Sequence, residues 1–298
     1  MTASSSDFDT VLDRVTAGDR LSASEIAVLS DAPDLLPLGM LADALRRRLR
    51  GTTVTYLRVA SCAVDQSFAE AVPPAAREVR ITGAPATLDV ALTAVRSAKA
   101  VAGDRTVSGF TWSDIDRVAS ASGTGVLRAL EALRAAGLDG IAELPMDALP
   151  DAVIGILADA GFRRLRLTIE HAPAADRRAL VERASALQDK YGCIQAVSPL
   201  PTLLQAFRPT TGYEDVKAVA MARLAAPNIP TIQVDWSRYG PKLAQVALTF
   251  GADDLDAVTA SDEAPDGRRR APVEEVRRNI EAAGFTPAER DGRFDQIT

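Results

Sequence analysis

Cysteine and histidine are scarce in this sequence, and their scarcity excludes several kinds of site. The 298 residues contain two cysteines, Cys62 and Cys193, and a single histidine, His171. Two cysteines so far apart in the sequence do not form a disulfide framework. No CxxC or HxxxH pair provides the ligand spacing of a zinc site, so the sequence predicts no metal site.

Excess positive charge and long apolar runs are also missing. The formal net charge is −6, whereas a nucleic-acid-binding surface is normally basic, so we expect no nucleic-acid partner. No apolar run is long enough to span a bilayer, so we expect no membrane partner. The N-terminal segment MTASSSDFDT is polar and acidic, unlike a signal peptide, and predicts a cytoplasmic protein. The many Ala, Arg, Asp and Val residues and few Lys residues are typical of a high-GC bacterial coding bias.

A regular alternation of strand-like and helix-like segments is the main positive signal. Hydrophobic residues make up 47% of the chain, which is typical of a protein with a folded core. Parallel strands joined by crossover helices produce such an alternation. The predicted strands cover residues 54–60, 78–82, 106–110, 138–144, 163–170, 193–199, 230–234 and 255–258. Eight such units favour an α/β fold of the (β/α)8 TIM-barrel type over an open doubly wound sheet.

The first 50 residues precede this alternation. They carry a helix-capping signature around Ser22 and leucines at helical spacing, so we predict a helical extension over residues 1–50. Residues 51–298 are predicted to form the barrel and a closing C-terminal helix. The segment between the first two strands is too short for a full crossover helix, which predicts a shortened first βα connection. No GxGxxG follows the first strand and no P-loop motif is present, so neither nucleotide-binding fold is supported.

The working groups of a barrel lie at the C-terminal ends of its strands. On that ground we predict a set of ligand-binding residues: Arg58, Thr82, Gly83, Thr111, Gln195, Gln233 and Trp236. The two glutamines lie on inward-facing strand positions, where a buried amide needs a partner that a ligand can provide. Trp236 and the nearby Tyr239 have a plainer reading as packing residues.

Three neighbouring ionisable residues, Asp147, Glu170 and His171, are the candidates for acid–base chemistry. They follow the predicted fourth and fifth strands, and a histidine titrates near neutral pH. Cys62 has two readings, a nucleophile activated by a base such as His171, or a small core residue. Asp253 and Asp254 are read either as a metal-binding or acid–base pair or as residues that hydrogen-bond the turn before the last strand.

The segment NIPTIQVDWSRYGPKLAQVALTFGADDLDAV, residues 228–258, carries the most specific signal. Together with QDKYGCIQAVSPLP upstream, it resembles radical S-adenosylmethionine enzymes of the futalosine route to menaquinone and of deazaflavin synthesis. These are aminofutalosine synthase, which it resembles most, cyclic dehypoxanthine futalosine synthase and the FO synthase subunit. The resemblance implies a (β/α)8 barrel of the radical S-adenosylmethionine kind, in agreement with the alternation of strands and helices.

One part of the family pattern is missing. The family places CxxxCxxC after the first barrel strand, where three thiolates hold a 4Fe–4S cluster. Here that spacing from Cys62 gives Gln66 and Ala69, and neither side chain replaces a thiolate. The motif that receives the methionine amino group reads Gly83-Ala84. Asp147 keeps an acid near the family's glutamate, and His171 matches the histidine that follows the fifth strand. We therefore expect no cofactor, no 4Fe–4S cluster and no residual S-adenosylmethionine binding.

These observations predict a non-radical pseudoenzyme of the family. It would act as an accessory protein in futalosine-type menaquinone biosynthesis, either paired with a true radical enzyme of that pathway or holding a small pathway intermediate. The alternative is a repurposed non-radical enzyme, in which Asp147, Glu170 and His171 perform elimination or hydrolysis on a chorismate-derived or nucleoside-like substrate.

Overall fold

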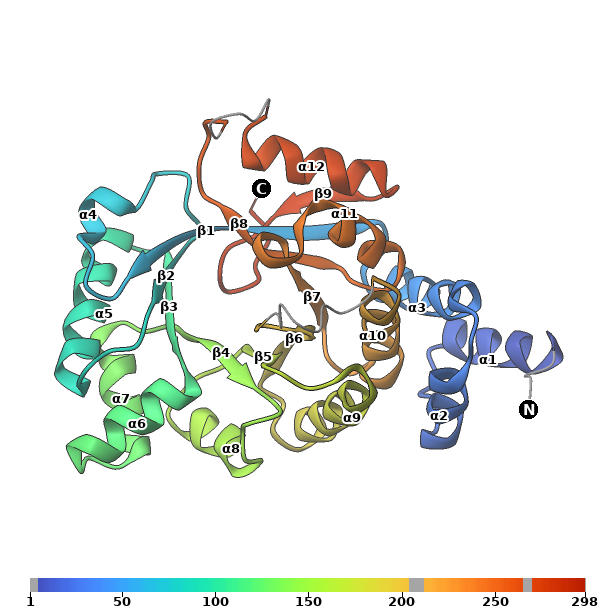
Figure 1. Cartoon of the computed structure of the whole chain (residues 1–298), viewed down its shortest axis with the longest axis horizontal. Helices are drawn as coiled ribbons and strands as arrows, with labels where there is room; N and C mark the ends of the chain where they lie inside the picture. Colours follow the sequence, from blue (N-terminus) through green and yellow to red (C-terminus); the bar gives the residue numbers. More distant parts are fainter. Residues whose placement is uncertain (1–4, 204–211, 265–269, 298) are drawn as a thin grey trace.

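The protein is described by a computed structural model that covers residues 5–203, 212–264 and 270–297. A closed ring of parallel strands lies inside a ring of helices (Figure 1). The barrel strands are β1 (Thr53–Ala63), β2 (Glu78–Thr82), β3 (Thr106–Thr111), β4 (Gly140–Pro145), β5 (Leu165–Ile169), β6 (Ile194–Pro201), β7 (Thr231–Asp235) and β8 (Asp254–Thr259). They pair in chain order from β2 to β8, and β1 pairs with both β8 and β2, which closes the ring. The predicted (β/α)8 barrel is confirmed.

Helices after the strands cover the outside of the barrel. They are α5 (Leu88–Ala102), α6 (Trp112–Ser122), α7 (Val126–Ala136), α8 (Ala152–Asp159), α9 (Ala174–Tyr191), α10 (Gly212–Ala225), α11 (Trp236–Thr249) and α12 (Pro272–Ala282). Two of them, α6 and α11, begin directly after β3 and β7, and their N-caps are the last residues of those strands, Thr111 and Asp235. Both N-termini therefore lie at the C-terminal end of the barrel.

The connection between β1 and β2 is short, as the sequence predicts. It spans residues 64–77, and its helix, α4 (Phe68–Ala71), has 4 residues. Pro73 and Pro74 follow almost at once, and proline cannot continue a helix because it lacks a backbone N–H. A crossover of this length still joins parallel strands here because β1 and β2 are direct neighbours, with Cys62 opposite Ile81.

Three helices precede β1: α1 (Ser5–Ala17), α2 (Ala23–Asp31) and α3 (Leu35–Arg50). The predicted capping box is present, since Ser22 and Glu25 hydrogen-bond each other's backbone N–H. Figure 1 shows these helices projecting from one side of the barrel beside α10. Leu38, Leu41 and Leu224 belong to one small apolar core between α3 and α10, so the extension is packed on the barrel through α10.

A ninth strand, β9 (Thr286–Glu289), is the main element that the sequence reading missed. It pairs in parallel with the first half of β1, on the edge whose second half pairs with β2. Its sequence, TPAE, is short and has no β-branched apolar run, so no strand pattern marks it. The residues after β9 turn under the N-terminal end of the barrel, where Gly292 lies against Thr106 and Glu78.

Side chains of the barrel strands alternate between the lumen and the helical layer, as in any strand. In β5, Leu165 and Leu167 belong to the apolar core under the helices, while Arg166 and Thr168 line a cavity in the lumen. Within the described residues, no helix has the length and apolar character needed to cross a membrane.

Candidate functional site: a polar cavity at the barrel mouth

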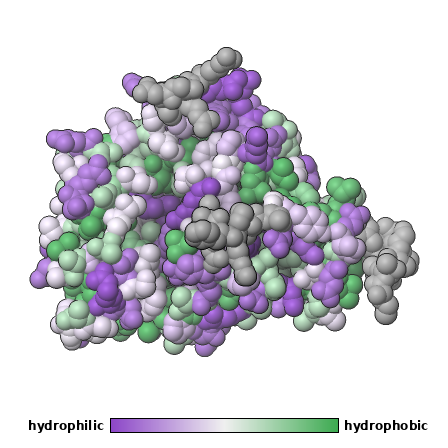
Figure 2. Space-filling view, in the orientation of Figure 1, coloured by the Kyte–Doolittle hydropathy of each residue, from purple (hydrophilic) through white to green (hydrophobic). Residues whose placement is uncertain are grey.

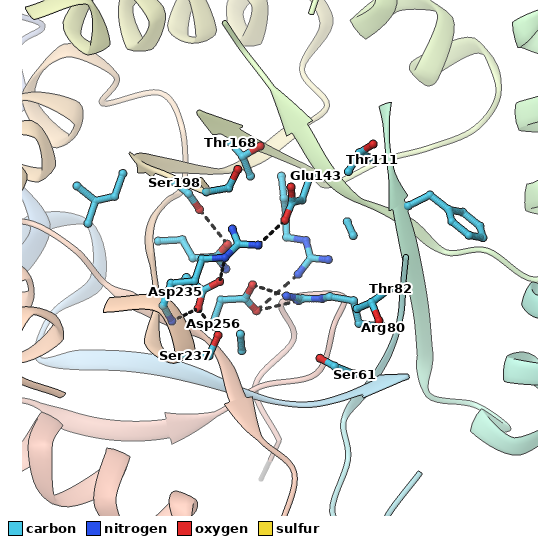
Figure 3. Close-up of a pocket in the computed structure, with 18 of the residues that line it drawn as sticks. Ser61, Arg80, Thr82, Thr111, Glu143, Thr168, Ser198, Asp235, Ser237 and Asp256 are labelled. Carbon is cyan, nitrogen blue, oxygen red and sulfur yellow. Dashed lines mark hydrogen bonds and ion pairs between the residues drawn. The ribbon is translucent and has the colours of Figure 1, made fainter. Parts of the chain in front are cut away.

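A cavity of about 290 Å³ opens at the C-terminal end of the barrel (Figure 3). Hydroxyl, amide and charged side chains line most of it, with Phe110 and Tyr239 as its aromatic walls. The polar lining residues are Ser61, Arg80, Thr82, Thr111, Asp114, Glu143, Arg166, Thr168, Ser198, Thr202, Gln233, Asp235, Ser237, Arg238 and Asp256. Every barrel strand, or the turn directly after it, contributes at least one of them.

The floor of the cavity is a buried network of two arginines and two carboxylates. Arg80 on β2 donates two parallel hydrogen bonds to Asp256 on β8, at 2.9 and 3.0 Å, and a third to Glu78 at 2.9 Å. Arg166 on β5 donates to Glu78 at 3.1 Å and lies 3.6 Å from Asp256. Two positive and two negative charges balance, so the floor carries no net charge.

Both carboxylates of the floor are held ionised by the arginines. Burial alone would raise the pKa of Asp256, but Arg80 and Arg166 lower that pKa well below its ordinary value. Burial also opposes ionisation of Glu78, and the same two arginines lower its pKa below the ordinary value. A buried charge is tolerated only when it is paired in this way.

A second buried ion pair closes the lumen beneath this floor. Arg290, just after β9, donates to both oxygens of Asp254, with the longer contact at 2.8 Å. Gln233 on β7 donates to the same carboxylate at 2.8 Å and accepts from Ser198 at 3.3 Å. The segment after β9 therefore supplies the cation that pairs with Asp254 at the N-terminal end of the barrel.

The rim of the cavity carries a different kind of ion pair. Arg238, in the first turn of α11, donates to Glu143 on β4 at 2.6 Å. Two strands, β5 and β6, separate β4 from β7 in the ring, so this pair reaches across the mouth (Figure 3). Both side chains are about a third exposed, at 32% and 28%. Arg238 also lies 3.5 Å from Asp235, so the rim has one more carboxylate than it has guanidinium groups in this cluster.

Three polar atoms at one side of the cavity have no hydrogen-bond partner. They are the Oγ1 atoms of Thr168 and Thr202 and the Nη1 atom of Arg166, the last of which forms an ion pair with Asp256 at 3.6 Å. All three side chains are more than nine-tenths buried and line the cavity. The backbone N–H of Thr202 donates to Ile169 at 2.7 Å, so the ends of β5 and β6 are held together here. We call these three residues the β5–β6 corner.

Four of the predicted ligand-binding residues, Thr82, Gly83, Thr111 and Gln233, line the cavity. Gly83 has a φ of +85°, a conformation that suits glycine, at the end of β2. The other three do not line it. Arg58 faces outward, bound to Glu289 at 2.7 Å and Asp262 at 2.7 Å. Gln195 lies near the start of β6, 3.5 Å from Thr231, and Trp236 is buried in the core under the helices.

The three acid–base candidates lie together but outside the cavity lining. The Asp147 carboxylate accepts the backbone N–H groups of Glu170, His171 and Ala172, at 2.8, 2.7 and 2.9 Å. These hydrogen bonds lower the pKa of Asp147 against the effect of burial. His171 is 56% exposed and lies 3.7 Å from Glu170. Asp147 therefore shapes the turn after β5, and the catalytic role of the three residues stays a prediction.

Asp253 and Asp254 lie at the opposite end of the barrel from the cavity mouth. Asp253 accepts the backbone N–H of Ile232 at 2.8 Å and pairs with Arg223 at 2.9 Å. Asp254 is the partner of Arg290 described above. The structural reading of this pair is the one that the contacts support. Among the described residues, no three His, Cys, Asp or Glu side chains are arranged to hold a metal ion.

Neither cysteine is placed to bind a cluster at the mouth. On β1, Ser61 lines the cavity, so its neighbour Cys62 points the other way, into the apolar core, where it is fully buried. Burial raises the pKa of the Cys62 thiol, which disfavours the thiolate. Cys193 directly precedes β6, at the other end of the barrel, and burial raises its pKa too. The donor set of a 4Fe–4S cluster, three thiolates, does not fit this chain.

Sequence reasoning missed the floor of the cavity. Arg80, Arg166 and Asp256 lie inside strands rather than at their ends, and we looked for candidates at the ends. A signal was present, because a charged residue between apolar neighbours in EVRIT and RLRLTIE must face the lumen if its neighbours face the helices. The pairing itself joins residues 176 positions apart and is not visible in the sequence.

Comparison with known proteins places this barrel among relatives. Residues 196–298 match the model of the CofH/MqnC C-terminal region. Aminodeoxyfutalosine synthase of Thermus thermophilus is 25% identical over 361 aligned positions, covering 96% of this chain and 95% of the relative. A 5-amino-6-(D-ribitylamino)uracil–L-tyrosine 4-hydroxyphenyl transferase of Archaeoglobus fulgidus is 26% identical, covering 86% and 92%. The chain is therefore a relative of the radical S-adenosylmethionine enzymes of menaquinone synthesis and of the CofH-like enzymes, as its sequence indicates.

Solved structures show the same fold at low sequence identity. The FeFe-hydrogenase maturase HydG from Carboxydothermus hydrogenoformans superposes with a TM-score of 0.69 at 13% identity, covering 97% of this chain and 81% of that one. Methylornithine synthase (PylB) superposes with a TM-score of 0.67 at 15% identity, covering 93% and 97%. At this identity the likeness concerns the fold alone.

Proposed function

We propose that this protein is a cluster-less relative of the futalosine-pathway enzymes that holds a small polar ligand at its barrel mouth. In this role it is an accessory protein of futalosine-type menaquinone biosynthesis rather than a radical enzyme. The single observation that carries the proposal is that this chain lacks the three cysteines with which the family binds its cluster. Where the family has three cysteines, this chain has a core-facing Cys62 followed by Gln66 and Ala69.

The cavity supports the ligand-holding part of the proposal. A barrel that had become purely structural would gain stability by filling its mouth with apolar side chains, because buried polar groups without partners are costly. Instead the lining keeps hydroxyl groups, Gln233 and charged pairs around about 290 Å³. That volume is at the lower end of the range for small-molecule sites. The names of the relatives refer to futalosine and ribitylaminouracil compounds, so we propose an intermediate of that kind as the ligand.

The first test is anaerobic reconstitution with iron and sulfide. We expect no 4Fe–4S absorption band above that of a Cys62→Ala, Cys193→Ala double variant. We also expect no 5′-deoxyadenosine from S-adenosylmethionine under reducing conditions. A stoichiometric cluster in the wild type that the double variant lacks would contradict the proposal, and so would radical turnover.

A second test concerns the partner. A true radical enzyme of the pathway should co-purify with this protein from the native cell at a defined stoichiometry if the protein works as an accessory subunit. Recovery of the protein alone, with a bound small molecule identified by mass spectrometry, would instead favour a ligand carrier. The recovery of neither a partner nor a ligand would count against both forms of the accessory role.

The alternative of a repurposed enzyme gains no support from the cavity, because Asp147, Glu170 and His171 do not line it. It is tested directly with His171→Ala. Aerobic turnover of a pathway compound by the wild type, independent of S-adenosylmethionine and abolished in this variant, would establish the alternative and replace the accessory role.

A further inference from the structure

A second cavity, of about 270 Å³, lies at the N-terminal end of the barrel. It is surrounded by the starts of β1 and β7, the residue before β8, the last turn of α3 and the segment after β9. No described residue lines both this cavity and the one at the mouth, so the two are separate. The lining residues are Leu49, Arg50, Thr53, Thr55, Thr231, Asp253, Arg290, Phe294 and Gln296.

Among the described residues, Asp253 is the only carboxylate that lines this cavity, and both of its oxygens are already paired. Its Oδ1 lies 2.9 Å from Nη2 of Arg223, and its Oδ2 accepts from Nε of Arg50 at 3.1 Å. Two guanidinium groups therefore share this one carboxylate. Arg290, the other cation of the lining, is balanced by Asp254. The wall of the cavity thus has one positive charge that no carboxylate balances.

A further arginine, Arg46, adds to this excess behind the wall. Its side chain is fully buried, and its carboxylate partner, Asp43 at 3.0 Å, also pairs with another arginine of α3. Burial lowers the pKa of Arg223, and the charges of Arg50 and Arg46 lower it further, which shows that the three guanidinium groups repel one another. Like charges repel strongly where water is excluded. An anion in the cavity would therefore stabilise all three arginines.

The segment after β9 is strained where it borders the cavity. Phe294 has a φ of +67°, a left-handed conformation that is unfavourable for phenylalanine. Its ring lies over the guanidinium of Arg290, at 4.0 Å from the ring centre. The ring and Asp254 thus cover Arg290, which is 1% exposed, and leave Arg50 as the accessible cation of the lining. Strained backbone of this kind is concentrated at ligand sites.

The donors of the lining, unlike the buried arginines, are accessible. The Arg50 side chain is 38% exposed. Its Nη2 donates to the carbonyl of Pro230 and to the hydroxyl of Thr231, both at 3.0 Å, so the guanidinium is fixed before a ligand arrives. Its Nη1 has no partner among the described residues. The side chains of Thr53, which is half-buried, and Gln296, which is exposed, are unpaired there as well.

We propose that this cavity binds a small oxyanion, with Arg50 as the main contact and Thr53 and Gln296 as further donors. The ligand is a phosphate ion or the phosphate or carboxylate group of a metabolite. The oxygens of such a group accept the N–H and O–H donors of the lining and answer its positive charge, whereas a cation would be repelled. The inference goes beyond the proposed function and does not depend on it, because the mouth cavity lies at the other end of the barrel.

Inorganic phosphate is the first probe. Thermal unfolding of the full-length protein at pH 7 is compared with that in sodium chloride of equal ionic strength, because a ligand of the folded state raises the unfolding temperature. At roughly ten times the dissociation constant we expect a rise of about 2–4 °C. Acetate is titrated in the same way. Weaker binding of acetate than of phosphate identifies a phosphate-type site, and equal binding identifies a site for any oxyanion.

Two variants locate the bound ion. Gln296→Glu adds a carboxylate to the lining at an exposed residue, and we expect it to weaken phosphate binding by at least about tenfold through charge repulsion. Gln66→Glu is the matched control, the same substitution at an exposed residue after the mouth end of β1, and should bind phosphate like the wild type. Arg50→Gln should also lose about tenfold or more, the worth of a hydrogen bond to a charged group. If the loss of its bond to Asp253 unfolds Arg50→Gln, the exposed Gln296→Glu still decides.

Phosphate that stabilises the wild type no more than chloride does would overturn the inference, and so would equal phosphate binding by Gln296→Glu and Gln66→Glu. Arg238→Gln separates the two ends of the barrel, because Arg238 lines the mouth cavity. It should keep the wild-type affinity for phosphate. A loss of affinity in Arg238→Gln, with Gln296→Glu unaffected, would place the ion at the mouth and refute the N-terminal site. None of these results bears on the cluster reconstitution, which tests the proposed function separately.

Discussion

The two ends of this barrel solve the problem of buried charge in different ways. At the N-terminal end, Asp254 and Arg290 are fully buried, and the tail that carries Arg290 packs against the strand starts. At the mouth, Glu143 and Arg238 form an ion pair that water still reaches, above a cavity with unpaired hydroxyls. The N-terminal end also has a cavity, of about 270 Å³, lined by Asp253 and Arg290, and the Thr106 hydroxyl there has no partner, so the two ends differ mainly in how far water reaches their ion pairs.

The surface of the molecule agrees with this contrast. Figure 2 shows hydrophilic and hydrophobic residues interspersed over this face, with hydrophilic residues prominent near its middle. The larger exposed apolar side chains include Leu36 and Met40 on α3, away from the cavity, and Leu203, next to Thr202 of the cavity lining. Among the described residues, the rim of the mouth is mainly polar, so a partner that covers it would meet mostly polar groups.

The strongest way to break this comparison is to remove one partner of the buried pair at the N-terminal end. Asp254→Ala removes the main counter-charge of the buried Arg290 and leaves it only the weaker contact with Asp256 at 3.9 Å, so we expect the free energy of unfolding to fall by about 3–5 kcal/mol. Urea unfolding at pH 7 measures this loss. A double variant, Asp254→Leu with Arg290→Met, should recover much of it because no buried charge is left unpaired. A loss below about 1 kcal/mol for the single variant would show that this end of the barrel is not sealed by the ion pair.

The tail contact gives a second, smaller effect. A Cβ atom at Gly292 would lie 2.6 Å from both Glu78 Oε2 and the Cβ of Thr106, too close to fit without movement. Gly292→Ala should therefore destabilise the protein by about 1–3 kcal/mol, the usual cost of overpacking. Gly212→Ala is the matched control, since a Cβ there meets no atom within 4 Å. Equal unfolding midpoints for the two variants would argue against a tightly packed tail.

The floor of the cavity predicts a pH dependence. The pKa of Asp256 is lowered in the folded protein, so its ion pairs contribute their full stability above the unfolded pKa of about 3.9. This contribution is lost as the pH falls from there toward the lowered folded pKa. On acidification through this range, the free energy of unfolding should therefore fall more steeply for the wild type than for Asp256→Asn, by up to about 1.4 kcal/mol per pH unit. Thermal unfolding measured between roughly pH 5 and pH 2, the range in which Asp256 takes up its proton, gives this slope. Asp65→Asn, an exposed carboxylate, should keep the wild-type slope, and identical slopes for Asp256→Asn would refute the assignment.

The rim pair should give the smallest effect. Glu143→Gln breaks the contact with Arg238, but both side chains are partly exposed, so the loss of unfolding free energy should stay below about 1 kcal/mol. The same urea titration measures it. A loss as large as that of Asp254→Ala would mean that the two ends do not differ, and the contrast between them would have to be abandoned.

The sequence was sufficient for the barrel because strand and helix patterns are local. It also identified the short first connection, since two prolines and few residues lie between the first two strands. It could not identify β9, whose pairing with β1 depends on tertiary contact rather than on its own composition. At the site, Thr82 was predicted correctly because it ends a strand, and Gln233 because it lies within one. Arg58 was predicted wrongly because its side chain lies on the outward face of β1, the same face as that of Cys62. The β5–β6 corner was out of reach, because an unpaired hydroxyl can be recognised only once its neighbours are known.

The position of Arg290 also constrains how this chain is made. Asp254 belongs to β8 and Glu78 to β2, yet the cation that pairs with Asp254 is Arg290, which follows β9 beside β1. During synthesis, β1 is made long before Arg290, the cation that pairs with Asp254. The Asp254 carboxylate can therefore gain this cation only once Arg290 has been made, long after β1 and β2.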